Sequence, residues 1–120
     1  MKLAVSATGD ELDAQLDRRF GRCSFFLLVD TDTMEFETIQ NSSRSASGGA
    51  GVKAAQTLAD SEVDGLITGN IGPNAFNALT SAGINIFTGA SGTVKEAIEK
   101  YSEEELSQAN EPTADGGSGK

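Results

Sequence analysis

Residues 64–83 read DGLITGNIGPNAFNALTSAG, which is a short apolar run, a glycine-rich turn and a segment of helical periodicity. Asp64 to Thr68 has the composition of a buried strand. Pro73 suits the first turn of a helix, where its missing N–H costs no hydrogen bond. Apolar residues then recur at helical spacing up to Gly83, which is typical of a helix terminator. This strand, turn and helix predict one unit of a parallel α/β sheet.

The same unit recurs on both sides of this stretch. On the C-terminal side, a strand over Ile84 to Thr88 leads to paired glycines and then to Thr93-Val-Lys-Glu96, the capping-box pattern that begins a helix. On the N-terminal side, Gly48-Gly-Ala-Gly51 precedes apolar residues at helical spacing. The N-terminal third of the chain holds three strand candidates that predict a β-meander: residues 2–6, 23–30 and 35–40.

The predicted order of elements is therefore β-β-β-α-β-α-β-α. Parallel strands joined through helices need right-handed crossovers, and the N-terminal meander adds an antiparallel flank. We expect an α/β fold with a mixed five-stranded sheet flanked by helices, close to the ribonuclease H-like topology. Residues 1–107 form one domain in this prediction. Residues 108–120 lack periodic apolar residues and are expected to form a flexible C-terminal tail.

The composition excludes several classes of site. The 120 residues include no histidine and one cysteine, Cys23, so the chain has no Ser-His-Asp triad, no His-ligated zinc and no four-thiolate centre of its own. A single thiol favours a cytoplasmic location over a secreted disulfide scaffold. The formal charge of −9 disfavours nucleic acid and anionic membranes as partners. No apolar stretch approaches the roughly 20 residues of a membrane helix.

Three glycine loops, at residues 48–51, 69–74 and 89–93, precede the predicted helices. Ligands of open α/β sheets usually bind beyond the carboxyl ends of the parallel strands, where helix N-termini favour anions. All three loops fall in stretches without Asp or Glu. Caps and tight turns explain each loop taken alone, whereas an anion site explains their shared lack of acids. The candidate anion-binding residues of these loops are Gly49, Gly69, Asn70, Gly72, Asn74, Gly89 and Gly92.

All four arginines lie within residues 18–44, and Lys53 follows them. If the fold gathers them, they offset the repulsion between an anionic ligand and the acidic chain, whereas solvated surface charges are the alternative. Flanking arginines would lower the pKa of an exposed Cys23 and make it a candidate metal ligand. A small buried strand residue is the alternative for Cys23, and Phe20 is expected in the core. The basic residues of this region are Arg18, Arg19, Arg22, Arg44 and Lys53, of which Arg19, Arg22 and Lys53 are candidates for contact with an anion.

Four segments, in their order along the chain, resemble one known family. They are Arg19-Phe-Gly-Arg-Cys23 leading into Phe25-Phe-Leu-Leu-Val-Asp30, Gly48-Gly-Ala-Gly51 with Ala54-Ala-Gln56, Gly69-Asn-Ile-Gly-Pro-Asn-Ala-Phe76, and Gly89-Ala-Ser-Gly-Thr-Val-Lys-Glu-Ala97. Over about residues 2–112 the chain resembles the dinitrogenase iron–molybdenum cofactor biosynthesis family, and in particular its small stand-alone members.

The resemblance implies a ribonuclease H-like fold and a non-enzymatic carrier that binds metal–sulfur clusters or their precursors non-covalently. One small member type holds a molybdenum–copper sulfide cluster, so we expect such a cluster, or an iron–molybdenum cofactor precursor, as the cargo. Other metallocluster assembly or acceptor proteins are the expected partners. Arginines and helix N-termini are the groups that an anionic cluster needs around it.

The chain departs from the family pattern in two places. Arg19 stands where several nitrogenase-linked relatives have a histidine before Phe-Gly, and the C-terminal segment lacks the histidines that many stand-alone relatives carry. Both departures disfavour the nitrogenase cofactor itself as the cargo. A cluster that brings its own sulfide ligands fits this chain better.

Two other classes of function use the same elements. A ribonuclease H-like nuclease needs carboxylates that converge on Mg²⁺, and neither Lys2 to Ser6 nor the ends of the parallel strands supply them. A regulatory or interaction module that binds a phosphorylated metabolite at the glycine loops would use the same charges, so the sequence leaves that alternative open. No nucleophile with a nearby base is visible, which argues against an enzyme.

Overall fold

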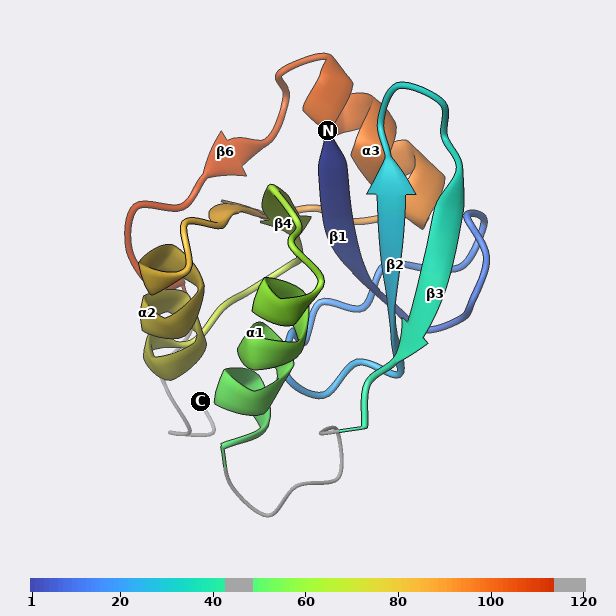
Figure 1. Cartoon of the computed structure of the whole chain (residues 1–120). Helices are drawn as coiled ribbons and strands as arrows, with labels where there is room; N and C mark the ends of the chain where they lie inside the picture. The colour runs from blue at the N-terminus through green and yellow to red at the C-terminus, as the bar shows by residue number, and fades with distance from the viewer. Residues whose placement is uncertain (43–48, 114–120) are drawn as a thin grey trace.

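The computed structural model describes residues 1–42 and 49–113, which form a mixed α/β fold. Helices α1 and α2 cover one face of a single sheet and α3 covers the other, as Figure 1 shows. The elements, in chain order, are β1 (Lys2–Ala7), β2 (Phe25–Asp30), β3 (Phe36–Gln40), α1 (Ala50–Asp60), β4 (Gly65–Ile67), α2 (Pro73–Ser81), β5 (Asn85–Thr88), α3 (Val94–Ser102) and β6 (Ser107–Gln108).

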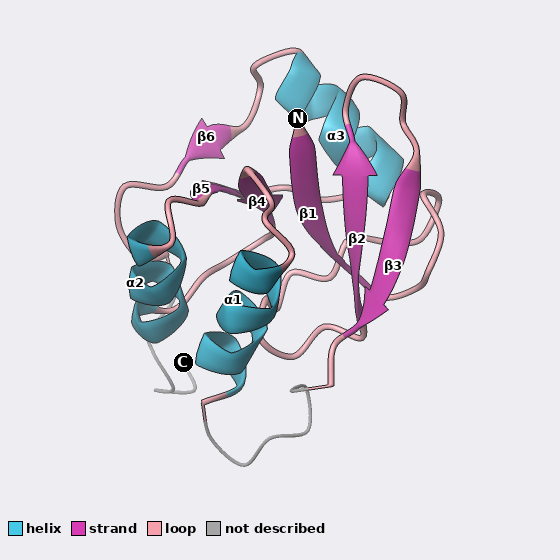
Figure 2. Cartoon of the chain, in the orientation of Figure 1, coloured by secondary structure: helices cyan, strands magenta, loops and turns pink. Residues whose placement is uncertain are grey.

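The sheet has a parallel centre and antiparallel flanks. Its strand order is β3-β2-β1-β4-β5-β6, with β1, β4 and β5 parallel to one another and β2, β3 and β6 antiparallel to their neighbours. Figure 2 shows the N-terminal meander at one side of the sheet. The expected α/β class and the order of the first eight elements are confirmed. The ribonuclease H-like assignment stays a prediction.

The expectation of five strands is wrong, because β6 adds a sixth. Ser107 and Gln108 pair with Thr88 and Phe87 of β5, so β6 forms the edge of the sheet. The pairing continues into the segment expected as a tail: the Ala109 N–H donates to the Ile86 carbonyl at 2.7 Å. Both residues of β6 are exposed and polar, so no apolar pattern marks them as a strand. Residues 114–120 lie outside the described part of the chain, and the division into domain and tail stays a prediction.

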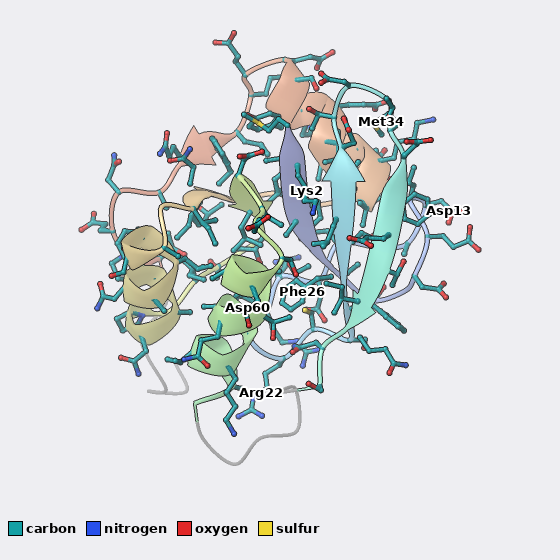
Figure 3. All side chains as sticks on the ribbon, in the orientation of Figure 1. Lys2, Asp13, Arg22, Phe26, Met34 and Asp60 are labelled. Atoms are coloured by element: carbon teal, nitrogen blue, oxygen red, sulfur yellow. The ribbon has the colours of Figure 1, made fainter. Side chains whose placement is uncertain are left out.

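Each face of the sheet has its own core. Alternation along β1 places Leu3 and Val5 against α3, and Ala4 against α1 and α2. Phe26 of β2 points toward α1 in Figure 3, and its ring packs against Phe20 at a centroid separation of 5.3 Å. This contact confirms Phe20 as a core residue. None of the described helices combines the length and the apolar composition needed to cross a membrane.

Candidate functional site

The candidate site lies at the carboxyl ends of the parallel strands, where residues 15–22 cross all three glycine loops. We call residues 15–22 the arginine segment. The Leu16 N–H donates to the Gly92 carbonyl at 2.8 Å, and the Arg18 carbonyl accepts from the Asn70 N–H at 3.0 Å. Farther along, Gly21 packs directly against the backbone of Gly51. The segment therefore meets the loops in the reverse of their order along the chain, and the structure brings the predicted loops together.

Two of the glycines, Gly69 and Gly21, are needed because backbones approach closely, and a third, Gly51, lies where two helices touch. A Cβ on Gly69 would lie 2.6 Å from the Arg18 Cβ and 2.7 Å from its Cα. A Cβ on Gly21 would lie 2.9 Å from the Gly51 nitrogen. A Cβ on Gly51 would lie 3.1 Å from the Ala75 Cβ, so the first turns of α1 and α2 touch. Close packing thus accounts for these glycines without a ligand, a reason that differs from the caps and tight turns expected from the sequence.

Several backbone N–H groups of the second and third loops are already bonded within the protein. The Asn70 N–H donates to Arg18, and the Gly89 N–H donates to the Gly69 carbonyl at 3.0 Å. The Ile71 N–H donates to the Thr113 hydroxyl at 2.9 Å. Of the predicted anion-binding residues, Asn70 and Gly89 therefore have their backbone N–H groups in hydrogen bonds within the protein. Gly69 itself is buried, whereas Asn70 and Gly89 are exposed.

The N-termini of α1 and α2 lack acidic residues. Their N-caps are Gly49 and Gly72, which have no side chain to cap the helix, and neither helix has an acid in its first turn. Asn74, in the first turn of α2, is exposed. Since the two first turns touch, the partial positive charges of two helix ends add at one place. Gly48 and Arg44 lie outside the described residues.

The third loop differs from the other two in its charge, because the helix that follows it, α3, begins with a capping box that includes an acid. The Thr93 N–H donates to Glu96 Oε1 at 2.8 Å, and the Glu96 N–H donates to the Thr93 hydroxyl at 3.1 Å. These bonds hold the pKa of Glu96 below its usual value. The carboxylate lies against Gly92, so a negative charge already occupies this helix end. The structure therefore places Gly92 in a helix cap, where an anion is disfavoured.

The basic side chains of the site are exposed. Arg18, Arg19, Arg22 and Lys53 all reach solvent, and Arg22 lies beside the first turn of α1 in Figure 3. Arg19 pairs with Asp17 at 3.1 Å, and this carboxylate raises the pKa of Arg19 above its ordinary value. A surface pocket of about 340 Å³ opens beside these residues, lined by Arg18, Gly69, Asn70, Gly89, Ala90 and Ser91.

Cys23 does not have the exposure that a metal ligand needs. Its side chain is fully buried, and burial is the main cause that raises the pKa of its thiol to about 12. The thiol donates to the Phe20 carbonyl at 3.3 Å. In the described part of the chain, no group of three or more histidine, cysteine or acidic residues could hold a metal ion. The structure thus agrees with the alternative of a small core residue.

Three residues of the site are not predicted from the sequence: Asp17, Asn41 and Thr113. Asp17 is buried beneath Arg19, and Thr113 bonds the second glycine loop. The buried Asn41 amide donates to the carbonyls of Gly21 at 3.1 Å and Cys23 at 2.9 Å, which fixes the end of the arginine segment. A sequence signal exists only for Asp17, since Asp commonly bonds the backbone two residues on.

Comparison with known proteins identifies the family of the chain. Residues 1–104 match the family model described as dinitrogenase iron-molybdenum cofactor. The chain belongs to this family. The resemblance drawn from the four sequence segments is therefore confirmed, and membership relates the chain to metal-cofactor biosynthesis.

Two solved structures and one curated protein are similar to this chain over most of its length. The apo form of the orange protein from Desulfovibrio gigas superimposes with a TM-score of 0.92 at 40% identity, over 94% of this chain and 96% of that chain. A candidate NifB protein from Thermotoga gives a TM-score of 0.83 at 33% identity, over 96% and 98%. An uncharacterised protein of Methanocaldococcus jannaschii is 29% identical over 109 residues, covering 88% of this chain and 89% of its own length.

Proposed function

We propose that this family member is a non-enzymatic carrier that binds an anionic metal–sulfur cluster at the carboxyl edge of its sheet. The cargo we propose is a molybdenum–copper sulfide cluster or an iron–molybdenum cofactor precursor. Other metallocluster assembly or acceptor proteins in the cytoplasm are its proposed partners. The observation that carries the proposal is the meeting of two helix N-termini, neither with an acid in its first turn, with the exposed arginines of residues 15–22.

The chemistry of the available donors supports a cluster that supplies its own ligands. The chain has no histidine, and its single thiol is buried and protonated at neutral pH. What the site offers is charge and hydrogen-bond donors from Arg19, Arg22 and Lys53, together with the first turns of α1 and α2. A sulfide-ligated anion needs these groups and no protein thiolate. Cys23 has no part as a metal ligand in this proposal.

Anaerobic reconstitution tests the function. The protein is incubated with tetrathiomolybdate and Cu(I), desalted, and measured for bound metal and for a visible charge-transfer band. We expect stoichiometric metal that stays with the protein. Loss of all metal on desalting would contradict the proposal, and so would displacement of the metal by an equal concentration of a phosphate ester, which would favour a metabolite-binding module instead.

A matched pair of variants locates the site. Arg22→Gln removes one exposed positive charge beside α1, and we expect it to weaken binding by roughly tenfold, the order of one charge-assisted hydrogen bond. Lys95→Gln removes the same charge from exposed Lys95 on α3, which covers the opposite face of the sheet, and should leave binding unchanged. Equal losses in the two variants would show that only net charge matters.

A further inference from the structure

The buried carboxylate of Asp17 is an unexpected group at a site proposed for an anion. Its side chain is 6% exposed, and the other buried polar residues of the described chain, Ser6, Asn41 and Thr68, are neutral. Both carboxylate oxygens face Arg19: Oδ1 accepts from the backbone N–H at 2.9 Å and from Nε at 3.2 Å, and Oδ2 accepts from a terminal nitrogen at 3.1 Å.

Asp17 is also anchored to the sheet. Its N–H donates to the Ser6 carbonyl at 2.8 Å, and its own carbonyl accepts from the Ser6 hydroxyl at 2.6 Å. The Ser6 and Thr68 hydroxyls, both buried, lie 2.8 Å apart. Asp17 is thereby tied to β1 and, through Ser6, to the carboxyl end of β4. The backbone of Asp17 is therefore fixed to the sheet, and from this position its buried carboxylate bonds Arg19.

The ion pair with Asp17 has two opposite effects on Arg19. It leaves N–H groups of Arg19 able to bind an anion, but the negative charge of Asp17 repels that anion. Asp17 takes two of the five guanidinium N–H groups, so the other three are turned away from its carboxylate. The Arg19 side chain is 66% exposed, so these groups can meet a ligand. An anionic ligand bound to these groups is separated from the negative charge of Asp17 only by the guanidinium of Arg19. In the partly buried surroundings of Asp17, that repulsion is only weakly screened.

We infer that Asp17 is the internal counter-ion of Arg19, which lowers the affinity of the site for anionic metal sulfides and keeps the cargo exchangeable. This inference rests on the proposed carrier function. A carrier must release what it binds, and a buried carboxylate behind the binding arginine weakens the bound state without removing any donor. Asp17 is thus a positioning residue that acts on the cargo through Arg19.

The test compares Asp17→Asn with Asp13→Asn. The asparagine keeps an acceptor for the Arg19 backbone N–H and removes the buried charge. Asp13 is an exposed residue of the same loop, distant from Arg22 in Figure 3, and its variant makes the same change in net charge. With tetrathiomolybdate as the probe, we expect D17N to bind roughly tenfold tighter than the wild type and to release the anion more slowly. D13N should stay within about twofold of the wild type.

A double-mutant cycle with Arg19→Gln shows whether the effect passes through Arg19. The gain from D17N should vanish in the R19Q background. Weaker binding by D17N would overturn the inference, since it would mean that Asp17 serves only to hold Arg19 in place. An equal gain in D13N, or a gain that survives R19Q, would overturn it as well.

A measurement without cargo separates the inference from the proposed function. In the cargo-free protein, the Arg19 Nε–H should exchange slowly in NMR spectra of the wild type and quickly in D17N, because Asp17 accepts that hydrogen bond. If the wild type and all variants bind no tetrathiomolybdate, the proposed function fails and the counter-ion role falls with it, whatever the exchange rates. If the wild type binds and the exchange rate does not differ in D17N, only the counter-ion inference fails.

Discussion

Cys23 shows that burial can reverse the effect that neighbouring arginines in the sequence are expected to have on the pKa of a thiol. Three arginines precede it within five residues, yet the thiol points into the core behind Phe20. Burial and the nearby Asp17 carboxylate both disfavour the thiolate, and together they raise the thiol pKa from 9.0 to about 12. The folded protein therefore keeps a proton that the unfolded chain loses in alkaline solution.

This difference predicts an alkaline loss of stability. Between about pH 9 and pH 12 the unfolded chain binds fewer protons than the native state, so the free energy of unfolding falls as the pH rises. Cys23→Ala removes this contribution. Urea unfolding at a series of pH values should show the advantage of the wild type over C23A shrinking above about pH 9. An advantage that stays constant up to about pH 11 would contradict the raised pKa.

Gly69 is a residue of the site at which an added Cβ has no room. An added Cβ would overlap both Cβ and Cα of Arg18, and the backbone of Arg18 is held by its hydrogen bond from Asn70. We predict that Gly69→Ala destabilises the protein by about 1–3 kcal/mol, the usual cost of overpacking. Gly51→Ala is the control, because its Cβ would meet only the Ala75 methyl group at 3.1 Å. Denaturant unfolding of both variants measures the difference, and equal costs would refute the steric explanation.

At the scale of elements, β6 and the residues after it close one edge of the sheet. β6 pairs with β5, and the chain continues with hydrogen bonds from Ala109 to Ile86 and between Thr113 and Ile71. Without this segment, β5 would present an unpaired edge, which invites pairing with another chain. The short polar β6 therefore protects the end of the sheet that lies beside the second glycine loop.

Deletion of residues 107–120 tests this role. We predict a loss of about 2–4 kcal/mol, from a few net hydrogen bonds, together with association that depends on protein concentration. Truncation after Thr113 is the control, because it keeps β6 and the Thr113 hydrogen bonds. Thermal unfolding and sedimentation velocity provide the readouts. A monomeric deletion variant with unchanged stability would contradict the proposed edge protection.

Elements with strong local signals could be predicted from the sequence, and so could the edge of the sheet at which the three glycine loops lie. Pro73 at the start of α2 and the Thr93–Glu96 capping box of α3 are local features that tertiary contacts did not override. The carboxyl edge follows from the alternation of strands and helices. β6 could not be predicted, because Ser107 and Gln108 are held by the backbone of β5 and carry no apolar pattern of their own.

The failures within the site have a common physical cause. The Asn70 N–H cannot donate freely to a ligand because it bonds the Arg18 carbonyl, and the Gly89 N–H in the same way bonds the Gly69 carbonyl. Such long-range bonds leave no trace in local composition. The ion pair of Asp17 with Arg19 is local, but its burial depends on the packing of the whole arginine segment against the sheet.

At the scale of the whole molecule, the arginine segment and an acidic pocket lie at opposite ends of the strands. Arg18, Arg19 and Arg22 lie at the carboxyl ends of the parallel strands, whereas a pocket at the opposite end is lined by four acids and Lys2. The protein carries a formal charge of −9, and its longest dimension is 36 Å. An anion far from the surface is therefore repelled, while one close to the arginines is attracted. The acids of that pocket are Asp30, Glu35, Glu37 and Asp64.

The ionic strength determines whether an approaching anion is affected by the net negative charge of the whole protein or only by the nearby arginines. At about 0.01 M salt the Debye length of roughly 30 Å is comparable to the molecule, whereas at 0.15 M it is about 8 Å and only the local arginines act. We predict that the association rate of tetrathiomolybdate rises between these concentrations, the opposite of ordinary electrostatic steering. Stopped-flow absorbance measures the association rate. A steady decrease of that rate with salt would contradict the expected repulsion of the anion by the net charge of the protein at low salt.

The crossing of the glycine loops by residues 15–22 has a consequence for biosynthesis. The segment leaves the ribosome early, but its contacts belong to Gly51, Asn70 and finally Gly92, which is translated 76 residues after Leu16. Closing loops of this length is slow compared with forming a helix or a hairpin. The arginine segment therefore gains its full set of contacts only after Gly92, at the start of the last quarter of the chain, has emerged. Under the proposed carrier function, a cluster is then loaded onto the finished chain and not onto a partly folded one.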